Sequence, residues 1–134
     1  MGNKTKVLIV DDEMDFCVFV KRNLESGDEF EVAACSDSGQ ALETARSFRP
    51  DIALLDIMMP GLGGPDIAQE LTREGIPVVF LTAVVTKEEV GKSFLGDIGG
   101  QRFIAKPVSS DELAASIRSV LKVTALRKKL ESVE

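Results

Sequence analysis

The sequence predicts an α/β domain: a doubly wound, parallel, five-stranded sheet with helices on both faces. Short apolar runs of strand length recur five times along the 134 residues, and helical spacing or helix-capping residues occupy the segments between them. Strands that alternate with helices in this way form parallel sheets covered on both faces. The length suits one domain with a core of its own.

The expected strands share an apolar run that ends at charged or turn-forming residues. The central run leads into Asp56 and is bounded by Pro50 and by Pro60-Gly61, which indicates a buried strand with Asp56 at its C-terminal end. The second run is more polar, which favours a position nearer an edge. The five strands are expected at residues 6–10, 30–35, 52–56, 77–82 and 102–105.

Helical spacing and capping residues place helices between these strands. Phe16, Val20 and Leu24 recur at intervals of four, Pro65 suits a first helical turn, and Ser109 opens a capping sequence before the last helix. The helices are expected at residues 13–24, from Ser36 or Ser38 to 48, at 65–73, at 90–95 behind a capping box at 86–89, and from 109 towards the C-terminus.

Composition excludes several classes of function. The formal net charge of −6 argues against direct binding to nucleic acid, whose phosphates attract Lys and Arg, although an association through a partner stays open. No apolar run approaches the roughly 18 residues of a membrane helix, and no signal-peptide core is present, so we expect a cytoplasmic protein. Cys17 and Cys35 fit reduced core residues. The absence of His excludes Ser-His-Asp and Cys-His catalysis and His-ligated zinc.

Reactive side chains follow four of the five expected strands. Asp11 and Asp12 come after the first strand, Asp56 ends the third, Thr82 ends the fourth and Lys106 follows the fifth. Because the carboxyl ends of parallel strands share one edge of the sheet, where ligands bind, we expect these side chains to converge there.

This convergence predicts phosphoryl-transfer chemistry. Three neighbouring carboxylates repel one another, so the site should raise a pKa or bind a cation. Carboxylate oxygens suit Mg²⁺, and Mg²⁺ with a lysine is the equipment of phosphoryl transfer. Asp56 is then a candidate nucleophile that forms an acyl phosphate, while Lys106 pairs with a phosphoryl oxygen and the Thr82 hydroxyl donates to another.

Each of these residues also has a purely structural interpretation. The acidic stretch at residues 11–13 suits the start of a helix, Asp56 can cap a loop, Thr82 suits a strand, and Lys106 can be a solvated surface charge. Taken one at a time, most of these structural interpretations are the simpler ones. The joint placement of the residues at one predicted edge favours the functional interpretation.

In these motifs and their order the sequence resembles the receiver domain of bacterial response regulators, over residues 5–122. The resemblance implies a flavodoxin-like sheet with the strand order 2-1-3-4-5 that this family is known for. It also implies a signalling switch of a two-component phosphorelay rather than an enzyme, with no chemistry beyond its own phosphorylation and dephosphorylation. The matching motifs are Val10-Asp11-Asp12-Glu13, Leu54-Leu55-Asp56-Ile57-Met58-Met59-Pro60-Gly61, Leu81-Thr82-Ala83 and Phe103-Ile104-Ala105-Lys106-Pro107.

The resemblance assigns roles to individual residues. Asp56 would accept a phosphoryl group from the phosphohistidine of a sensor kinase or of a histidine phosphotransfer protein. Asp12, Asp56 and the backbone carbonyl of Met58 would bind Mg²⁺, and Asp11 would help to hold it, largely through water.

The resemblance also implies a switch that reports phosphorylation to a downstream protein target. The Thr82 side chain would shift towards the phosphoryl group and Phe103 would turn inward. Phe103 has no hydroxyl group, so its packing alone would report the change. A simple role of Phe103 as a core aromatic residue is equally open.

Two other functions share part of this residue set. An aspartate-nucleophile phosphatase of the haloacid-dehalogenase type also uses Asp, Thr, Lys and Mg²⁺, but it expects Asp-x-Asp-x-Thr after the first strand, where this chain has adjacent acidic residues. A flavodoxin-like flavin carrier needs a phosphate-binding first loop rich in Ser, Thr and Gly, and the acidic residues 11–13 would repel a phosphate.

The C-terminal tail has a pattern of its own. Val123, Leu126, Leu130 and Val133 are spaced by three, four and three residues, as in the seam of a coiled coil. We therefore divide the chain into a receiver domain at residues 1–122 and a helical extension at 123–134. A signalling helix towards an output domain, a dimer contact and a frayed end are all compatible with two heptads.

Overall fold

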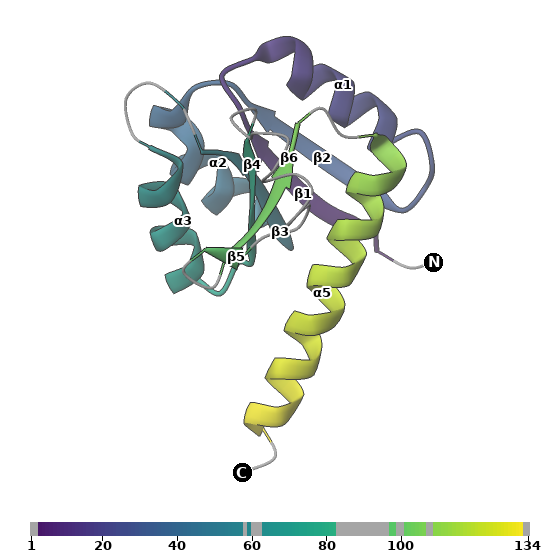
Figure 1. The fold of residues 1–134 in the computed structure, drawn as a ribbon, viewed down its shortest axis with the longest axis vertical. Helices are drawn as coiled ribbons and strands as arrows, with labels where there is room; N and C mark the ends of the chain where they lie inside the picture. The colour runs from purple at the N-terminus through teal and green to yellow at the C-terminus, as the bar shows by residue number, and fades with distance from the viewer. Residues whose placement is uncertain are drawn as a thin grey trace.

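The computed structural model describes residues 3–57, 59, 63–82, 97–98, 101–106 and 109–132. Its strands form one sheet in the order β2-β1-β3-β4-β6-β5 (Figure 1). They are β1 (Thr5–Val10), β2 (Phe30–Cys35), β3 (Ile52–Asp56), β4 (Val78–Thr82), β5 (Asp97–Ile98) and β6 (Gln101–Ala105).

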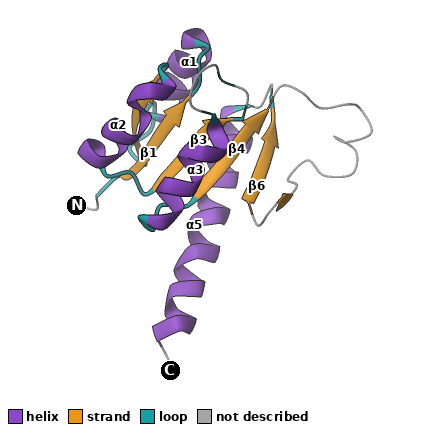
Figure 2. Cartoon of the chain, turned by 90° about the vertical axis from the view of Figure 1, so that its left-hand side faces the viewer, coloured by secondary structure: helices purple, strands orange, loops and turns teal. Residues whose placement is uncertain are grey.

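Five of these strands, β2, β1, β3, β4 and β6, are parallel to their neighbours, which confirms the predicted fold class and strand order. Figure 2 shows the arrows of β1, β3, β4 and β6 pointing the same way. The sixth strand, β5, was not predicted: it pairs antiparallel with β6 at the edge. A strand of two residues has no apolar run by which a sequence could reveal it.

The helices are α1 (Met14–Leu24), the 3₁₀ turn η1 (Ser38–Gln40), α2 (Ala41–Phe48), α3 (Gly64–Arg73) and α5 (Ser110–Ser132). Asp37, rather than either predicted serine, caps the second helical segment, because its carboxylate accepts a hydrogen bond of 2.9 Å from the Gly39 N–H. Ser109 caps α5 as expected by accepting a 3.1 Å hydrogen bond from the Glu112 N–H. The helix expected at residues 90–95 lies outside the described residues.

The core consists of two layers, one on each face of the sheet. Val7 and Ile9 of β1 face α1 and α5, whereas Leu8 and Val10 face α2 and α3. All four side chains are completely buried. Because both faces of the central strands are covered, these strands contain consecutive apolar residues that point to both faces, as parallel strands do.

The strand register brings the predicted reactive residues to one edge. Val10 pairs with Leu55, so the residues that follow β1 lie beside Asp56. Asp56 pairs with Leu81 and Thr82 pairs with Ala105, so Lys106 emerges next to the end of β4. Four segments that are distant in sequence therefore meet at the carboxyl edge of the sheet.

The last helix extends well past the sheet. α5 packs beside α1 in its first turns, and its second half continues beyond the body of the domain (Figures 1 and 2). Within the part of the chain that the structure describes, no helix combines the length and the apolar character needed to cross a membrane.

Candidate functional site

An acidic cluster lies at the carboxyl edge of the sheet. Asp11, Asp12 and Asp56 each offer one carboxylate oxygen, and these three oxygens lie within 4.8 Å of one another. Asp11 is completely buried and Asp56 is 5% exposed, whereas Asp12 is open to solvent. The structure thus brings together the three carboxylates that the strand pattern placed at one edge.

Lys106 supplies the positive charge of this cluster. Its ammonium lies 2.6 Å from Asp11 Oδ2, 3.1 Å from Glu13 Oε1 and 3.8 Å from Asp56 Oδ2. Burial alone would lower the pKa of Lys106, but the hydrogen bonds and charges of these carboxylates outweigh burial and raise the pKa. The Lys106 side chain is 8% exposed and stays an ammonium ion in the site.

Residues of α1 complete the surroundings of Lys106. The ammonium lies 4.6 Å from the centre of the Phe16 ring, a cation–π contact. Sequence reasoning placed Phe16 in the core stripe and Glu13 at the helix start, and it missed their contact with Lys106. The available signal was their position in the first turn after β1, which points towards the same edge.

Backbone hydrogen bonds fix Asp11 in place. Its Oδ1 accepts a 2.9 Å hydrogen bond from the Glu13 N–H, and its main-chain carbonyl accepts one of 3.3 Å from the Cys17 thiol. Burial, reinforced by the charge of Asp11, raises the pKa of Cys17 to about 11. Cys17 therefore remains a neutral thiol that donates to Asp11, in agreement with the predicted reduced core cysteine.

Gly64 at the start of α3 touches the backbone of the central strand. A Cβ atom added to Gly64 would lie 2.5 Å from the Asp56 carbonyl oxygen and 3.1 Å from Ile57 Cα. The close approach of α3 to the end of β3 is therefore compatible only with glycine at this position. The sequence predicts a helix that begins at residue 65 and does not reveal the contact of Gly64.

We expect Gly64→Ala to lower the free energy of unfolding by about 1–3 kcal/mol, as overpacking does, and to displace Asp56. Gly63→Ala is the matched control, because its Cβ would meet no atom closer than 3.6 Å. Urea unfolding of both variants measures the difference. Equal stability of the two variants would show that α3 does not pack against Asp56 as described.

The remaining predicted site residues are Thr82, Phe103 and Met58. Thr82 ends β4 at the same edge, and Phe103 lies in β6 opposite Phe80, one residue before Ile104. Only the backbones of Thr82 and Phe103 are described, and Met58 lies outside the described residues.

The residues present fit a divalent cation. The three aspartates and Glu13 face one ammonium, which leaves a formal excess of three negative charges. Asp11 Oδ2 is buried and, apart from its ion pair with Lys106, accepts no hydrogen bond from a described residue. A hard ion such as Mg²⁺, which takes carboxylate and water oxygens, matches both the charge and the type of ligand.

A doubly wound parallel sheet with aspartates and a lysine at its carboxyl edge defines a class of switch and phosphoryl-transfer proteins. Comparison with known proteins identifies the family within this class. The sequence model of the response regulator receiver domain matches residues 7–118. The probable transcriptional regulator ycf27 of Cyanophora paradoxa is 37% identical over 124 residues, which cover 91% of this chain and 50% of that protein. The DNA-binding response regulator MtrA of Mycobacterium tuberculosis is 36% identical over 121 residues, 89% of this chain and 51% of that protein.

Solved structures agree. The receiver domain of the Francisella response regulator 1452 superimposes with a TM-score of 0.71 at 29% identity, covering 90% of this chain and 99% of that one. The receiver domain of a modulated diguanylate cyclase from Desulfovibrio desulfuricans G20 gives a TM-score of 0.75 at 30% identity, with 93% and 99% covered.

The chain belongs to the response regulator receiver domain family. Receiver domains are signalling domains of two-component systems rather than enzymes in the ordinary sense, and they generally bind Mg²⁺ at an acidic pocket. The comparisons give no support to the phosphatase alternative. The chain spans about half the length of the curated relatives it matches.

Proposed function

We propose that this domain is a phosphorylation-activated switch with Asp56 as the phosphoryl acceptor. The observation that carries the proposal is the position of Asp56 at the end of β3, together with Asp11 and Asp12 and 3.8 Å from the Lys106 ammonium. An Asp56 carboxylate oxygen attacks the phosphorus of a partner's phosphohistidine, and the phosphorus–nitrogen bond breaks as the imidazole leaves. Water later cleaves the acyl phosphate and releases inorganic phosphate.

The neighbouring residues prepare this step. Asp12, Asp56 and the Met58 carbonyl would hold Mg²⁺, with Asp11 acting through water. Bound Mg²⁺ supplies positive charge that offsets the negative charge of the phosphoryl oxygens. Lys106, which pairs with Asp11 in this structure, turns to a phosphoryl oxygen once Asp56 is modified, because that group carries more negative charge.

The response to phosphorylation is assigned to Thr82 and Phe103. Thr82 ends β4 at the site edge, beside the strand that carries Asp56, and its hydroxyl would reach the modified carboxylate. Phe103 stands on β6, which pairs with β4, and its packing would follow the shift of Thr82. These two residues would carry the signal to the surface that meets a downstream protein target.

Treatment of the purified protein with acetyl phosphate and Mg²⁺ tests the proposal. Intact-mass analysis should find a single added group of about 80 Da, and chelation of Mg²⁺ should prevent its appearance. An unmodified mass in the presence of Mg²⁺ would reject the switch.

The phosphodonor is a sensor histidine kinase or a histidine phosphotransfer protein that meets the same edge. Met14, Val18 and Phe19 expose 54%, 47% and 44% of their surface on α1, next to the acidic cluster, and offer an apolar contact for it. We place the domain in the cytoplasm, which suits its two free thiols. The formal charge of −6 argues against direct contact of this domain with nucleic acid. In this it would differ from full-length relatives that are named as DNA-binding.

The helical extension predicted at residues 123–134 is the basis of a second part of the proposal, a homodimer through α5. Val123, Leu126 and Leu130 are 38%, 52% and 73% exposed. At about 100° per residue they lie on the side of α5 opposite the residues that face the domain. A second copy of the helix would cover this seam.

Dimerisation through α5 should become stronger as salt is added. With Val123 and Leu130 at one seam position and Leu126 at the other, parallel pairing sets Lys122 against Arg127 of the partner subunit. Salt screens this repulsion without weakening apolar contacts. Sedimentation equilibrium measures the effect, and a chain lacking residues 123–134 should stay monomeric. The same monomeric mass with and without these residues, at high concentration, would reject the dimer.

A further inference from the structure

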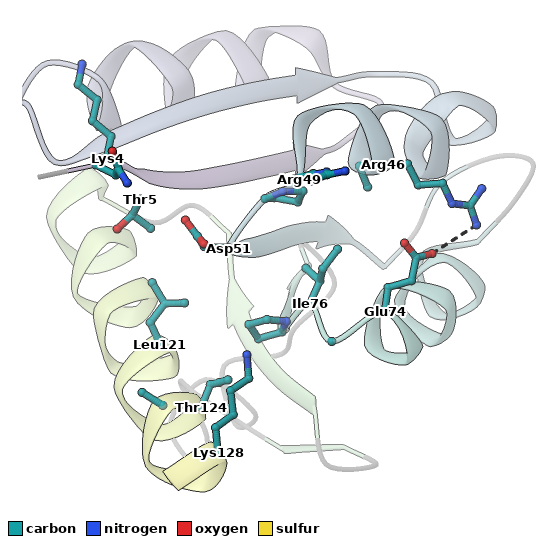
Figure 3. Close-up of a pocket in the computed structure, with 16 residues that line it drawn as sticks. Lys4, Thr5, Arg46, Arg49, Asp51, Glu74, Ile76, Leu121, Thr124 and Lys128 are labelled. Carbon is teal, nitrogen blue, oxygen red and sulfur yellow. Dashed lines mark hydrogen bonds and ion pairs between the residues drawn. The ribbon is translucent and has the colours of Figure 1, made fainter. Parts of the chain in front are cut away.

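A cavity lies at the edge of the sheet opposite Asp56 (Figure 3). It has a volume of about 890 Å³ and is bounded by the strand starts, by the ends of α2 and α3, and by the second half of α5. Thr5 begins β1, Asp51 precedes β3 and Pro77 precedes β4 at its rim. Nothing in the phosphoryl-transfer chemistry uses this cavity.

The cavity is positively charged within an acidic chain. Arg46 and Glu74 neutralise each other across 3.3 Å, and Asp51 Oδ2 already accepts a 2.8 Å hydrogen bond from the Lys6 N–H. The lining also contains Lys4, Arg49 and Lys128, so two positive charges remain after Asp51 is counted.

The two cations that matter most stand on different walls. In Figure 3 Lys128 extends from α5 into the cavity, and Arg49 stands on the wall that also carries Asp51. Neither side chain forms an ion pair with any residue in the described part of the chain. Two unpaired cations that border one space favour an anionic group between them.

The remaining lining is mixed, with Asn3, Thr5 and Thr124 beside apolar side chains. Ala45, Ile76 and Pro77 contribute apolar side chains from the body, and Leu121 and Ala125 contribute them from α5. Small-molecule sites have volumes of about 300–1,000 Å³, mostly apolar walls and a few placed polar groups. The cavity matches this description in volume and in its placed cations, and its apolar side chains suit an organic molecule that has an apolar part and a negative group.

Arg49 has an unusual backbone conformation for an arginine. It ends α2 in the left-handed region, with φ 55° and ψ 65°, and its N–H donates to the Ala45 carbonyl. Glycine or asparagine usually occupies such a cap, because other side chains raise its energy by about 1–2 kcal/mol. An arginine at this position places a guanidinium at the rim of the cavity at some cost in stability.

We propose that this cavity binds a small organic anion, with Arg49 and Lys128 holding its negative group and the apolar walls holding its rings or chain. Because Lys128 lies on the part of α5 that extends beyond the sheet, the bound anion ties that helix to the body of the domain. The site is independent of phosphorylation at Asp56.

The probe for the test is 1-anilinonaphthalene-8-sulfonate, which combines a sulfonate with aromatic rings and fluoresces when bound. The full chain should bind it saturably at a one-to-one ratio, and Arg49→Gln combined with Lys128→Gln should weaken binding by about tenfold or more. The uncharged relative N-phenyl-1-naphthylamine should bind the unaltered chain by about tenfold less, since it lacks the sulfonate. The Asp56→Asn variant should bind 1-anilinonaphthalene-8-sulfonate with the same affinity as the unaltered chain.

Arg22→Gln combined with Lys129→Gln is the matched control, because it removes the same charge from exposed positions outside the cavity. This control should retain the affinity of the unaltered chain, and circular dichroism should show all variants folded. Amide NMR shifts should locate the probe at Ile76 and Thr124. Absence of saturable binding, equal loss in both double variants, or shifts confined to the exposed face of α5 at Val123, Leu126 and Leu130 would overturn the proposal.

Discussion

Asp56→Asn should abolish phosphoryl acceptance while leaving the fold intact. The amide has nearly the shape of the carboxylate, but it lacks the anionic oxygen that attacks phosphorus and it contributes no charge to a divalent ion. After acetyl phosphate and Mg²⁺, the unaltered chain should gain about 80 Da and the variant should gain nothing measurable. A loss of at least about 100-fold in the rate of modification is expected, since covalent catalysis depends on this one oxygen.

Asp66→Asn is the control for this experiment. Asp66 is an exposed residue in the first turn of α3, so its substitution changes the net charge equally and leaves the site alone. Peptide mapping of the modified chain should place the added mass between Ile52 and Ile57. Modification of the Asn variant at the rate of the unaltered chain would remove Asp56 from the reaction, and the acceptor would have to be sought elsewhere.

Removal of the Asp56 charge should also stabilise the protein when Mg²⁺ is absent. Asp11 and Asp56 are buried beside each other and share one ammonium. Like charges at this distance disfavour each other's ionised form, so a neutral residue at 56 relieves repulsion. The site thus trades some stability for its chemistry, as sites with clustered charges do.

The strand ends show why much of this site could be predicted from sequence. An apolar run that stops at a charged residue gives the end of a buried strand, and parallel strands share an edge, so Asp11, Asp56, Thr82 and Lys106 could be assigned to one place without coordinates. The register confirms that the strands which carry them are adjacent.

The missed features depend on distances that a pattern does not contain. The closest carboxylate to Lys106 is Asp11 at 2.6 Å, whereas Asp56 lies at 3.8 Å, and only the side-chain geometry decides between them. Gly64 resembles any loop glycine until the Asp56 carbonyl is placed against it. The sequence could not identify Asp37 as the cap, because three adjacent polar residues there can all cap a helix.

The cavity beside α5 could not be predicted for a related reason. Its cations come from the end of α2 and from α5, and these residues are about 80 positions apart in a part of the fold that lacks a strand end. Sequence reasoning followed the carboxyl edge, where parallel strands gather reactive residues. At the opposite edge no equivalent rule brings side chains together, so only the packing of α5 reveals the site.

Lys106→Met should destabilise the protein strongly in the absence of Mg²⁺. Methionine keeps the length of the side chain but removes the ammonium that pairs with buried Asp11 and lies 3.8 Å from Asp56. Breaking a buried ion pair in this way costs about 3–5 kcal/mol. Urea unfolding with a chelator present should show this loss, whereas Lys129→Met, at an exposed position of α5, should change stability by less than about 0.5 kcal/mol.

Mg²⁺ should then restore much of the free energy of unfolding that Lys106→Met has lost. The Lys106 ammonium and a divalent ion compete for the same carboxylates, so removal of the ammonium should raise the affinity for Mg²⁺ by about tenfold. In the unaltered chain the pKa of Lys106 is higher in the folded than in the unfolded state, so its ion pairs contribute fully to stability below pH 10.5, the ordinary lysine pKa. This contribution is lost only as the pH rises through the higher pKa of the folded state. Unfolding midpoints measured across a Mg²⁺ titration at neutral pH follow both effects. If Lys106→Met proved as stable as the unaltered chain without Mg²⁺, or if its Mg²⁺ affinity fell, Lys106 would not be the cation that holds the acidic cluster together.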